Sequence, residues 1–178
     1  MAEFHAPPDA LPFFRTLFQR GVGVAIQTGV TLEDLLCRQW QIDRDYVMNR
    51  ISTLFLDAKP VDDLAAAVVE DGATLALSGA MPGLIGATMR RGGVLAPFRS
   101  GITYCASAAP HTSGDGRITL KLFNLLIDEL GPRFLARGVW IERSRLAEHF
   151  PGHPDLSGVG NGAVCVVMPT PRTTADTP

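Results

Sequence analysis

The fold is decided by residues 54–93, which read LFLDAKPVDDLAAAVVEDGATLALSGAMPGLIGATMRRGG. Apolar and β-branched runs at residues 51–56 and 73–77 predict two strands, because each run is bounded by residues that favour turns. Between them, Asp62 can cap a short helix that extends to Val69. After the second strand, a glycine-rich segment leads into an apolar helix. This order predicts an α+β domain in which short helices pack on a mixed β-sheet.

Two further apolar runs, at residues 13–18 and 21–28, precede this stretch. They are joined by residues 19–21, and the second run alternates apolar with small or polar residues, which predicts a β-hairpin. A helix is expected to begin at Thr31, because Thr31 and Asp34 have the spacing of a capping box.

The order hairpin, helix, strand, short helix, strand over residues 13–77 resembles the β-grasp topology of the sulfur-carrier proteins of thiamine and molybdopterin synthesis. The residues that carry the resemblance are TLEDLL at 31–36, the run at 54–61 and VEDGATLAL at 69–77. Those carriers end in a free Gly-Gly that becomes the thiocarboxylate, whereas the Gly-Gly pair at 92–93 is internal here. The resemblance therefore implies the fold and not the carrier chemistry.

The composition divides the chain into four segments. We expect a flexible arm over residues 1–12, a β-grasp-like part over 13–93, an α/β part over 94–168, and a disordered tail over 169–178. The tail contains too few apolar residues to order itself. The two central parts are expected to pack as one domain.

The second half of the chain has a less regular pattern. Residues 117–130 are interpreted as a strand followed by a helix, and one long helix is the alternative. The other predicted elements are a strand at 102–106, a helix ended by Gly131-Pro132, a strand at 139–142, a helix from Ser144 to Phe150 and a strand at 163–168.

The composition is that of a globular protein with little charge. Of the 178 residues, 46% are apolar and 19% are charged, and the formal net charge is −2. Nucleic acid binding is not expected, because no basic excess exists to neutralise phosphates. The sparse charge leaves apolar surface to be covered, which favours a homo-oligomer or a protein partner.

Membrane insertion and secretion are not expected either. No stretch approaches the roughly 20 apolar residues of a membrane span, and residues 1–14 lack the basic and apolar regions of a signal peptide. Cys37, Cys105 and Cys165 are odd in number and widely spaced, which predicts free thiols in a reducing compartment. We therefore expect a cytoplasmic protein.

The loop from Gly79 to Gly86 is the leading candidate for a ligand site. A strand, a loop that contains Gly79, Gly83 and Gly86, and a helix N-terminus together present backbone N–H groups to an anion. Three arginines follow and can hold a carboxylate or phosphate: Arg90, Arg91 and Arg99. The spacing matches no phosphate-binding motif, and the alternative is that small residues let the helix pack closely on a neighbour.

Two further pairs of residues are candidates, one for catalysis and one for metal binding. Cys105 and His111 are the residue types of a thiol nucleophile and its base, although Cys105 also suits a small core residue. His149 and His153 are weak candidates for metal ligands, and a surface loop is the alternative interpretation. No cofactor is expected.

These patterns lead to two hypotheses for function. The first is a non-catalytic binding or interaction module, because no catalytic constellation has adequate spacing. The alternative is an enzyme that acts on a small molecule with a phosphate or carboxylate group. Its ligand would bind at the loop Gly79–Gly86, and Cys105 or His111 would supply the chemistry.

Overall fold

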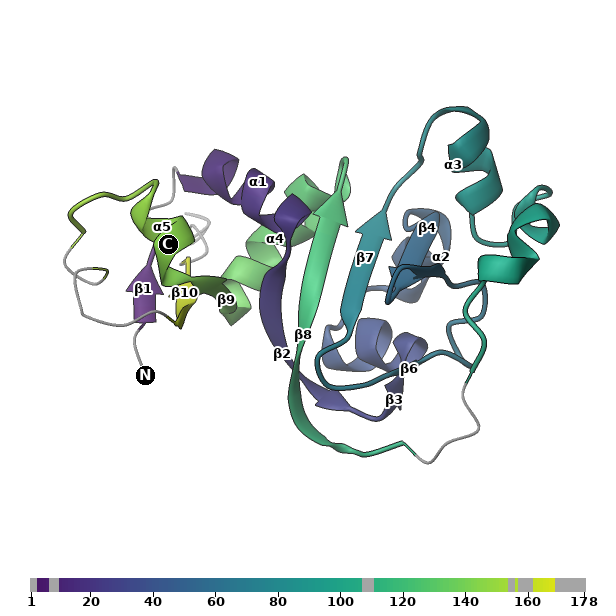
Figure 1. Cartoon of the computed structure of the whole chain (residues 1–178), viewed down its shortest axis with the longest axis horizontal. Helices are drawn as coiled ribbons and strands as arrows, with labels where there is room; N and C mark the ends of the chain where they lie inside the picture. The colour runs from purple at the N-terminus through teal and green to yellow at the C-terminus, as the bar shows by residue number, and fades with distance from the viewer. Residues whose placement is uncertain (1–2, 7–9, 107–110, 154–155, 157–161, 169–178) are drawn as a thin grey trace, which may run out of the picture.

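The computed structural model describes residues 3–6, 10–106, 111–153, 156 and 162–168. It combines helices with a mixed sheet, which confirms the predicted α+β class (Figure 1). The strand order of the large sheet is β1 (Glu3–His5), β10 (Ala163–Val167), β9 (Val139–Glu142), β2 (Val22–Thr28), β8 (Gly114–Phe123), β7 (Thr74–Ser78), β4 (Thr53–Leu56) and β5 (Lys59–Pro60). A second, two-stranded sheet pairs β3 (Val30–Thr31) with β6 (Val68–Val69).

Helices pack around the large sheet and connect its strands. They are α1 (Leu11–Arg20), the π-helix η2 (Asp34–Gln39), α2 (Arg44–Asn49), α3 (Gly83–Met89), the 3₁₀-helix η3 (Ala96–Ile102), α4 (Leu126–Arg137) and α5 (Arg143–Ala147). Across the described residues, none of these helices has the length and apolar character that crossing a membrane requires.

The central strands β7 and β8 are parallel, and each has an antiparallel neighbour on its other side. Side chains alternate between the two faces of a strand. Leu75 and Leu77 of β7 and Leu120 and Leu122 of β8 are fully buried in the core. The intervening residues, such as Ala76, are only half-buried. One face of this part of the sheet is therefore core, and the other is open to solvent.

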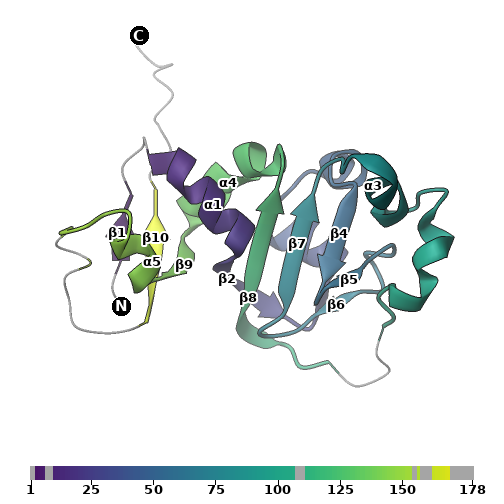
Figure 2. The ribbon, with the colours of Figure 1, turned by 45° about the horizontal axis from the view of Figure 1, so that its top comes forward.

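The large sheet has two parts that meet at a narrow junction (Figure 1, Figure 2). Strand β9 pairs with β2 through Gly23 and Trp140 alone. A Cβ added at Gly23 would lie 2.9 Å from the Cβ of Trp140, so a side chain there would push the two strands apart. The guanidinium of Arg117 also covers the Trp140 ring, at 3.9 Å from its centroid.

The prediction of a strand at residues 13–18, the first strand of the expected hairpin, is wrong, because these residues lie in α1. Phe14, Leu17 and Phe18 are buried at helical spacing, so a helix covers the core with all three at once. A proline stands in the first turn of α1, where its missing N–H has no intrahelical partner to lose.

The partner of β2 comes instead from the C-terminal half of the chain. Strand β8 pairs with β2 from Val22 opposite Leu120 to Thr28 opposite Gly114. Because β8 lies between β2 and β7, strands from both expected parts, 13–93 and 94–168, pair in one sheet.

Two local predictions around the glycine loop are also wrong. Residues 62–69 form no helix; Asp63 accepts the N–H groups of Ala65 and Ala66 in a turn, and β6 follows. Residues 102–106 form no strand, because the preceding residues wind into η3 around the buried side chain of Arg99.

The predicted break at Gly131-Pro132 is wrong as well, since α4 continues to Arg137. Asp128, whose carbonyl loses its helical partner at the proline, is an exposed residue that water can reach. Gly131 packs against the Phe18 ring, where an added Cβ would lie 3.2 Å from the nearest ring atom.

At the N-terminus, residues 3–5 form β1 rather than part of a flexible arm. Strand β1 runs parallel to β10, and Phe4 is fully buried beside the Phe150 ring. This apolar contact and the strand pairing anchor a segment that composition alone marks as flexible.

Several predicted elements are confirmed. Strands occur at β4, β7, β9 and β10, and residues 117–130 hold a strand followed by a helix. The Thr31 hydroxyl accepts the N–H of Asp34 at 3.1 Å, as its spacing predicts. The segment 169–178 lies outside the described residues.

Candidate functional site

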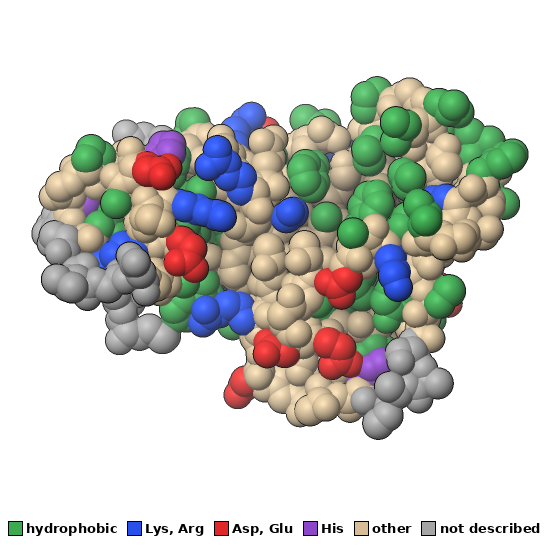
Figure 3. Space-filling view, viewed as in Figure 1, with side chains coloured by type: hydrophobic (Ala, Val, Ile, Leu, Met, Phe, Trp, Pro, Cys, Tyr) green, Lys and Arg blue, Asp and Glu red, His purple; other side chains and the backbone are tan. Residues whose placement is uncertain are grey.

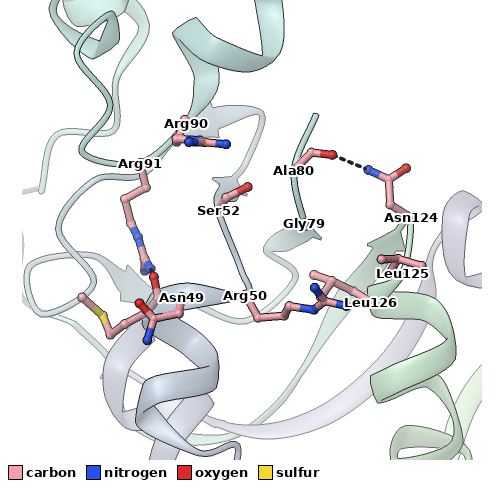
Figure 4. A pocket seen from close by; sticks show the side chains of 11 residues that line it. Asn49, Arg50, Ser52, Gly79, Ala80, Arg90, Arg91, Asn124, Leu125 and Leu126 are labelled. Atoms are coloured by element: carbon pink, nitrogen blue, oxygen red, sulfur yellow. Dashed lines mark hydrogen bonds between the residues drawn. The ribbon is translucent and has the colours of Figure 1, made fainter. Parts of the chain in front are cut away.

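A cavity of about 410 Å³ opens at the carboxyl ends of β7 and β8 (Figure 4). Its lining comes from four segments: residues 48–50 with 52, residues 79–80, residues 90–91 and residues 124–126. We call this cavity the arginine pocket. Ligands of sheets with parallel strands characteristically bind outside the carboxyl ends of those strands.

Three arginines line the arginine pocket: Arg50 after α2, and Arg90 and Arg91 after α3. No Asp or Glu is among the described lining residues. The Arg90 side chain is exposed, extends toward the middle of the cavity in Figure 4, and makes no hydrogen bond or ion pair with a described residue. The cavity therefore presents positive charge that the protein leaves partly uncompensated.

Arg91 is fixed more firmly than Arg90. Its backbone N–H donates to the Ser52 carbonyl at 2.8 Å, and its Nη2 donates to the carbonyls of Val47 and Met48 at the end of α2. Its Nη1 and the Ser52 Oγ are buried without a hydrogen-bond partner among the described residues. Burial lowers the pKa of Arg91, and the nearby Asp62 carboxylate opposes this shift.

Arg50 is held in place by the carboxylate of Glu129 on α4. Its Nε donates to both carboxyl oxygens of Glu129 at 3.1 Å, and its Nη2 donates to Oε1. The Tyr46 hydroxyl donates to the same carboxylate at 2.5 Å. The hydrogen bonds from Arg50 and Tyr46 lower the pKa of Glu129, while burial and this bond raise the pKa of Tyr46.

Asn124 ties the ends of the two parallel strands together. Its φ of 56° lies in the left-handed region, which asparagine tolerates better than most residues. In this conformation Nδ2 donates to Ser78 Oγ at 3.1 Å and to the Ala80 carbonyl at 3.4 Å, the bond drawn in Figure 4. The residue thereby fixes one wall of the cavity.

The structure brings together only part of the predicted anion site. Gly79, Arg90 and Arg91 line the arginine pocket, whereas Gly83 and Gly86 are not among its lining residues. Gly83 has a φ of 76° and open space around it, so it serves the backbone turn into α3. At Gly86 an added Cβ would lie 2.0 Å from the Met81 carbonyl oxygen, so this glycine permits close packing.

Arg99 is a structural residue and not part of an exposed anion clamp. Its residue surface is 3% exposed, and its guanidinium forms an ion pair with Asp62 at 2.6 Å. The same guanidinium donates to the carbonyls of Thr88 and Arg90 and to the Thr103 hydroxyl. It therefore holds α3, η3 and the turn between them in place.

The candidates for nucleophile and base occupy different surroundings. Cys105 is exposed, lines a separate shallow cavity beside Thr103, and is not the core residue that the alternative interpretation proposed. His111 lies 2.6 Å from Glu70 through its Nδ1. Five prominent cavities open among the described residues, and none of these five is lined by both Cys105 and His111.

The two candidate metal ligands pack against aromatic rings. The His149 ring lies 3.8 Å from the Phe13 ring and the His153 ring 4.9 Å from the Phe4 ring, measured between centroids. Within the described part of the chain, no group of three His, Cys, Asp or Glu residues has a geometry that could hold a metal ion.

Sequence reasoning missed Arg50, Ser52 and Asn124. Arg50 and Ser52 precede the glycine loop by some distance in the chain, and Asn124 belongs to the strand that enters the sheet from the C-terminal half. An asparagine directly after an apolar strand is a signal for a special turn. The pairing of β8 with β7, which places it at the site, has no local signal.

Comparison with protein-family models, with curated proteins and with solved structures gave no match to this chain.

Proposed function

We propose that this protein is a non-catalytic binding module whose ligand is a small molecule with a carboxylate or phosphate group. The observation that carries the proposal is the arginine pocket, in which Arg50, Arg90 and Arg91 meet without a lining carboxylate. Guanidinium groups bind carboxylates and phosphates through paired, charge-assisted hydrogen bonds.

The electrostatics of the pocket support an anionic ligand. Arg91 is partly buried and has a lowered pKa, so an anion nearby would stabilise its charged form. The 12-residue helix α4 directs its N-terminal end at the cavity, where its dipole adds partial positive charge. A volume of about 410 Å³ falls within the range of small-molecule sites.

The lining supports binding rather than catalysis. The lining contains one hydroxyl, that of Ser52, but no His, Cys, Lys, Asp or Glu among the described lining residues could act as its general base or as another nucleophile. Cys105 and His111, which the enzyme hypothesis needs, do not line the arginine pocket. The enzyme hypothesis therefore has less support than the binding hypothesis.

Calorimetric titration of the purified protein with phosphate, sulfate and simple carboxylates tests this proposal. Binding is expected to weaken as salt is added, because charge pairing supplies the affinity. Arg90→Gln should reduce the affinity about tenfold or more, the loss of one charge-assisted bond. Arg38→Gln is the matched control, because the Arg38 side chain is 83% exposed and not part of the lining.

The result that would overturn the proposal is an absence of heat with every anion. Equal binding by the Arg90→Gln and Arg38→Gln variants would also overturn the assignment of the site. A ligand present at about 100 times its Kd should add roughly 2.7 kcal/mol to the free energy of unfolding, so a thermal shift provides an independent readout.

A second proposal, independent of the first, is that the protein self-associates in the cytoplasm. Figure 3 shows hydrophobic side chains gathered around α3 and the neighbouring segments. Leu84 and Ile85 of α3 are 74% and 70% exposed, and Val94 and Phe98 are 93% and 84% exposed. Exposed apolar patches of this kind commonly mark contacts with a partner.

Sedimentation of the wild-type chain and of the Leu84→Gln, Phe98→Gln double variant tests self-association. A dimer that dissociates in the double variant is the expected result. A wild-type monomer at concentrations of tens of micromolar would contradict it, since that excludes a dimer of moderate affinity.

A further inference from the structure

A second cavity, of about 460 Å³, lies on the open face of the sheet beside the arginine pocket. We call it the sheet-face groove. Its lining includes the apolar residues Phe55, Ala76, Met81, Pro82 and Phe123, together with Asn124 and one charged residue, Lys121. Unlike the arginine pocket, this groove is walled mainly by apolar side chains. Figure 3 shows hydrophobic side chains gathered on this face of the molecule.

The register of the strands explains why a groove forms there. Strand β7 lies between β4 and β8 and presents the small side chains of Thr74, Ala76 and Ser78 to the open face. Phe55 stands opposite Ala76 on one side, and Phe123 stands opposite Ser78 on the other. Small residues on the middle strand therefore form a floor between two aromatic walls.

The groove adjoins the arginine pocket. Its floor follows β7 to Ser78, and the next two residues, Gly79 and Ala80, line the arginine pocket. Asn124 lines both cavities, and its Nδ2 donates to the Ala80 carbonyl at 3.4 Å. The outer face of β7 spans about 13 Å at the rise of a β-strand.

The charges of the arginine pocket favour a negatively charged head. Arg50 is already paired with Glu129, whereas neither Arg90 nor Arg91 forms an ion pair with a residue that the structure describes. Asp62, whose charge acts on Arg91, is itself paired with Arg99. A carboxylate or a phosphate ester beside Arg90 and Arg91 would balance their charge, while an uncharged tail would cover the aromatic walls.

We propose that the ligand is an amphipathic anion, with its charged head beside Arg90 and Arg91 in the arginine pocket and an apolar tail along the sheet-face groove. This inference rests on the proposed function and names the class of its ligand: a medium-chain or aromatic carboxylate or phosphate ester. Free inorganic anions would bind through the head site alone.

The test is calorimetric titration with a homologous series: acetate, butanoate, hexanoate and octanoate, all below micellar concentration. Affinity should rise by about two- to fourfold for each methylene that the groove removes from water. Octanamide, which has the same tail without the charge, should bind at least tenfold more weakly than octanoate. Octyl phosphate compared with octanoate identifies which head the arginines prefer.

Variants separate the two cavities. Ala76→Leu fills the groove without removing a packed side chain, and it should flatten the chain-length series while acetate and phosphate binding remain unchanged. Phe123→Ser should have the same effect through loss of one wall, and its melting curve reports whether it folds. Arg90→Gln should lower the affinity of every member of the series by a similar factor.

Each outcome decides between the two proposals. Equal affinity for acetate and octanoate would overturn the amphipathic ligand and leave the anion site intact. Tail-dependent binding that Arg90→Gln does not alter would overturn the placement of the head. If no member of the series and no inorganic anion binds, the proposed function fails together with this inference.

Discussion

The three arginines between residues 90 and 99 belong to two clusters: Arg99 lies in a buried cluster, and Arg90 and Arg91 lie in the arginine pocket. The clusters differ in how many of the guanidinium N–H groups donate to acceptors within the protein. Arg99 is buried, and five hydrogen bonds join its guanidinium to Asp62, Thr88, Arg90 and Thr103. A guanidinium has five N–H donors, so this one is saturated.

The cluster in the arginine pocket is incomplete by comparison. Arg91 uses only its Nη2 in side-chain hydrogen bonds to described residues, and its Nη1 is buried without a partner. Arg90 has no side-chain partner among those residues. A saturated arginine stabilises the fold, whereas arginines with open donors beside a cavity favour an external acceptor. Substitutions in the two clusters should therefore have different effects: a large loss of stability at Arg99, and mainly a loss of anion binding in the arginine pocket.

The largest effect is expected at the saturated cluster. Arg99→Met should destabilise the protein by about 3 kcal/mol, because it leaves the Asp62 carboxylate and two backbone carbonyls without their partner. Urea unfolding measures the change. Arg99→Lys, which retains the charge but loses the forked geometry, should fall between the wild type and Arg99→Met. A loss below about 1 kcal/mol in Arg99→Met would show that the cluster is not saturated in solution.

A smaller loss of stability is expected for Arg91→Met. This change removes two hydrogen bonds from a charged donor to the carbonyls at the end of α2, but it also relieves the burial of that charge, so the net loss should be about 1–2 kcal/mol. The variant should also lose anion binding. Stability equal to that of the wild type would mean that water hydrogen-bonds the carbonyls at the end of α2 in place of Arg91. Of the two clusters, only that of Arg99 would then contribute to the stability of the fold.

The third prediction concerns pH. Burial opposes ionisation of Asp62, but hydrogen bonds from Arg99 and the Gly92 N–H outweigh it, so the pKa of Asp62 is lowered. Its contribution to stability is therefore present above the usual carboxyl pKa of about 3.9 and is lost as the pH falls through the lowered value. The stability difference between wild type and Asp62→Asn should shrink between about pH 5 and the acid limit of folding. A difference that is independent of pH would contradict the shift.

The smallest effect on stability is expected at Arg90. Arg90→Gln should change the free energy of unfolding by less than about 0.5 kcal/mol, as is usual for an exposed residue without special contacts. The same variant should nevertheless lose about half or more of the anion-induced thermal shift. If Arg90→Gln is strongly destabilising, Arg90 has a structural role and the distinction between the clusters fails.

The sequence was a good guide wherever neighbouring residues determine the structure. Strands β4 and β7 follow from short apolar runs between turn residues, and the loop into α3 follows from its glycines. It was a poor guide at residues 13–18, because Phe14, Leu17 and Phe18 fit a helix face as well as a short apolar run. The choice between them depends on the surface that they cover.

The candidate site shows the same dependence on distant residues. Gly79, Arg90 and Arg91 could be predicted because one continuous segment contains them. Arg50 and Asn124 join them only through the packing of α2 and the pairing of β8 with β7. Arg99 was misjudged because an arginine is almost never fully buried unless it is paired, and its partner Asp62 lies 37 positions away in the chain.

The central position of β8 has a consequence for the protein during its synthesis. A ribosome that has made residues 1–113 has produced β2 and β7 but not the strand that joins them. Both strands then present unpaired edges, and such edges favour association with other chains. When β8 emerges, this one strand pairs with both edges and adds the wall that Phe123 forms in the sheet-face groove. Between the translation of β7 and that of β8 the chain is therefore open to misassembly and to chaperones.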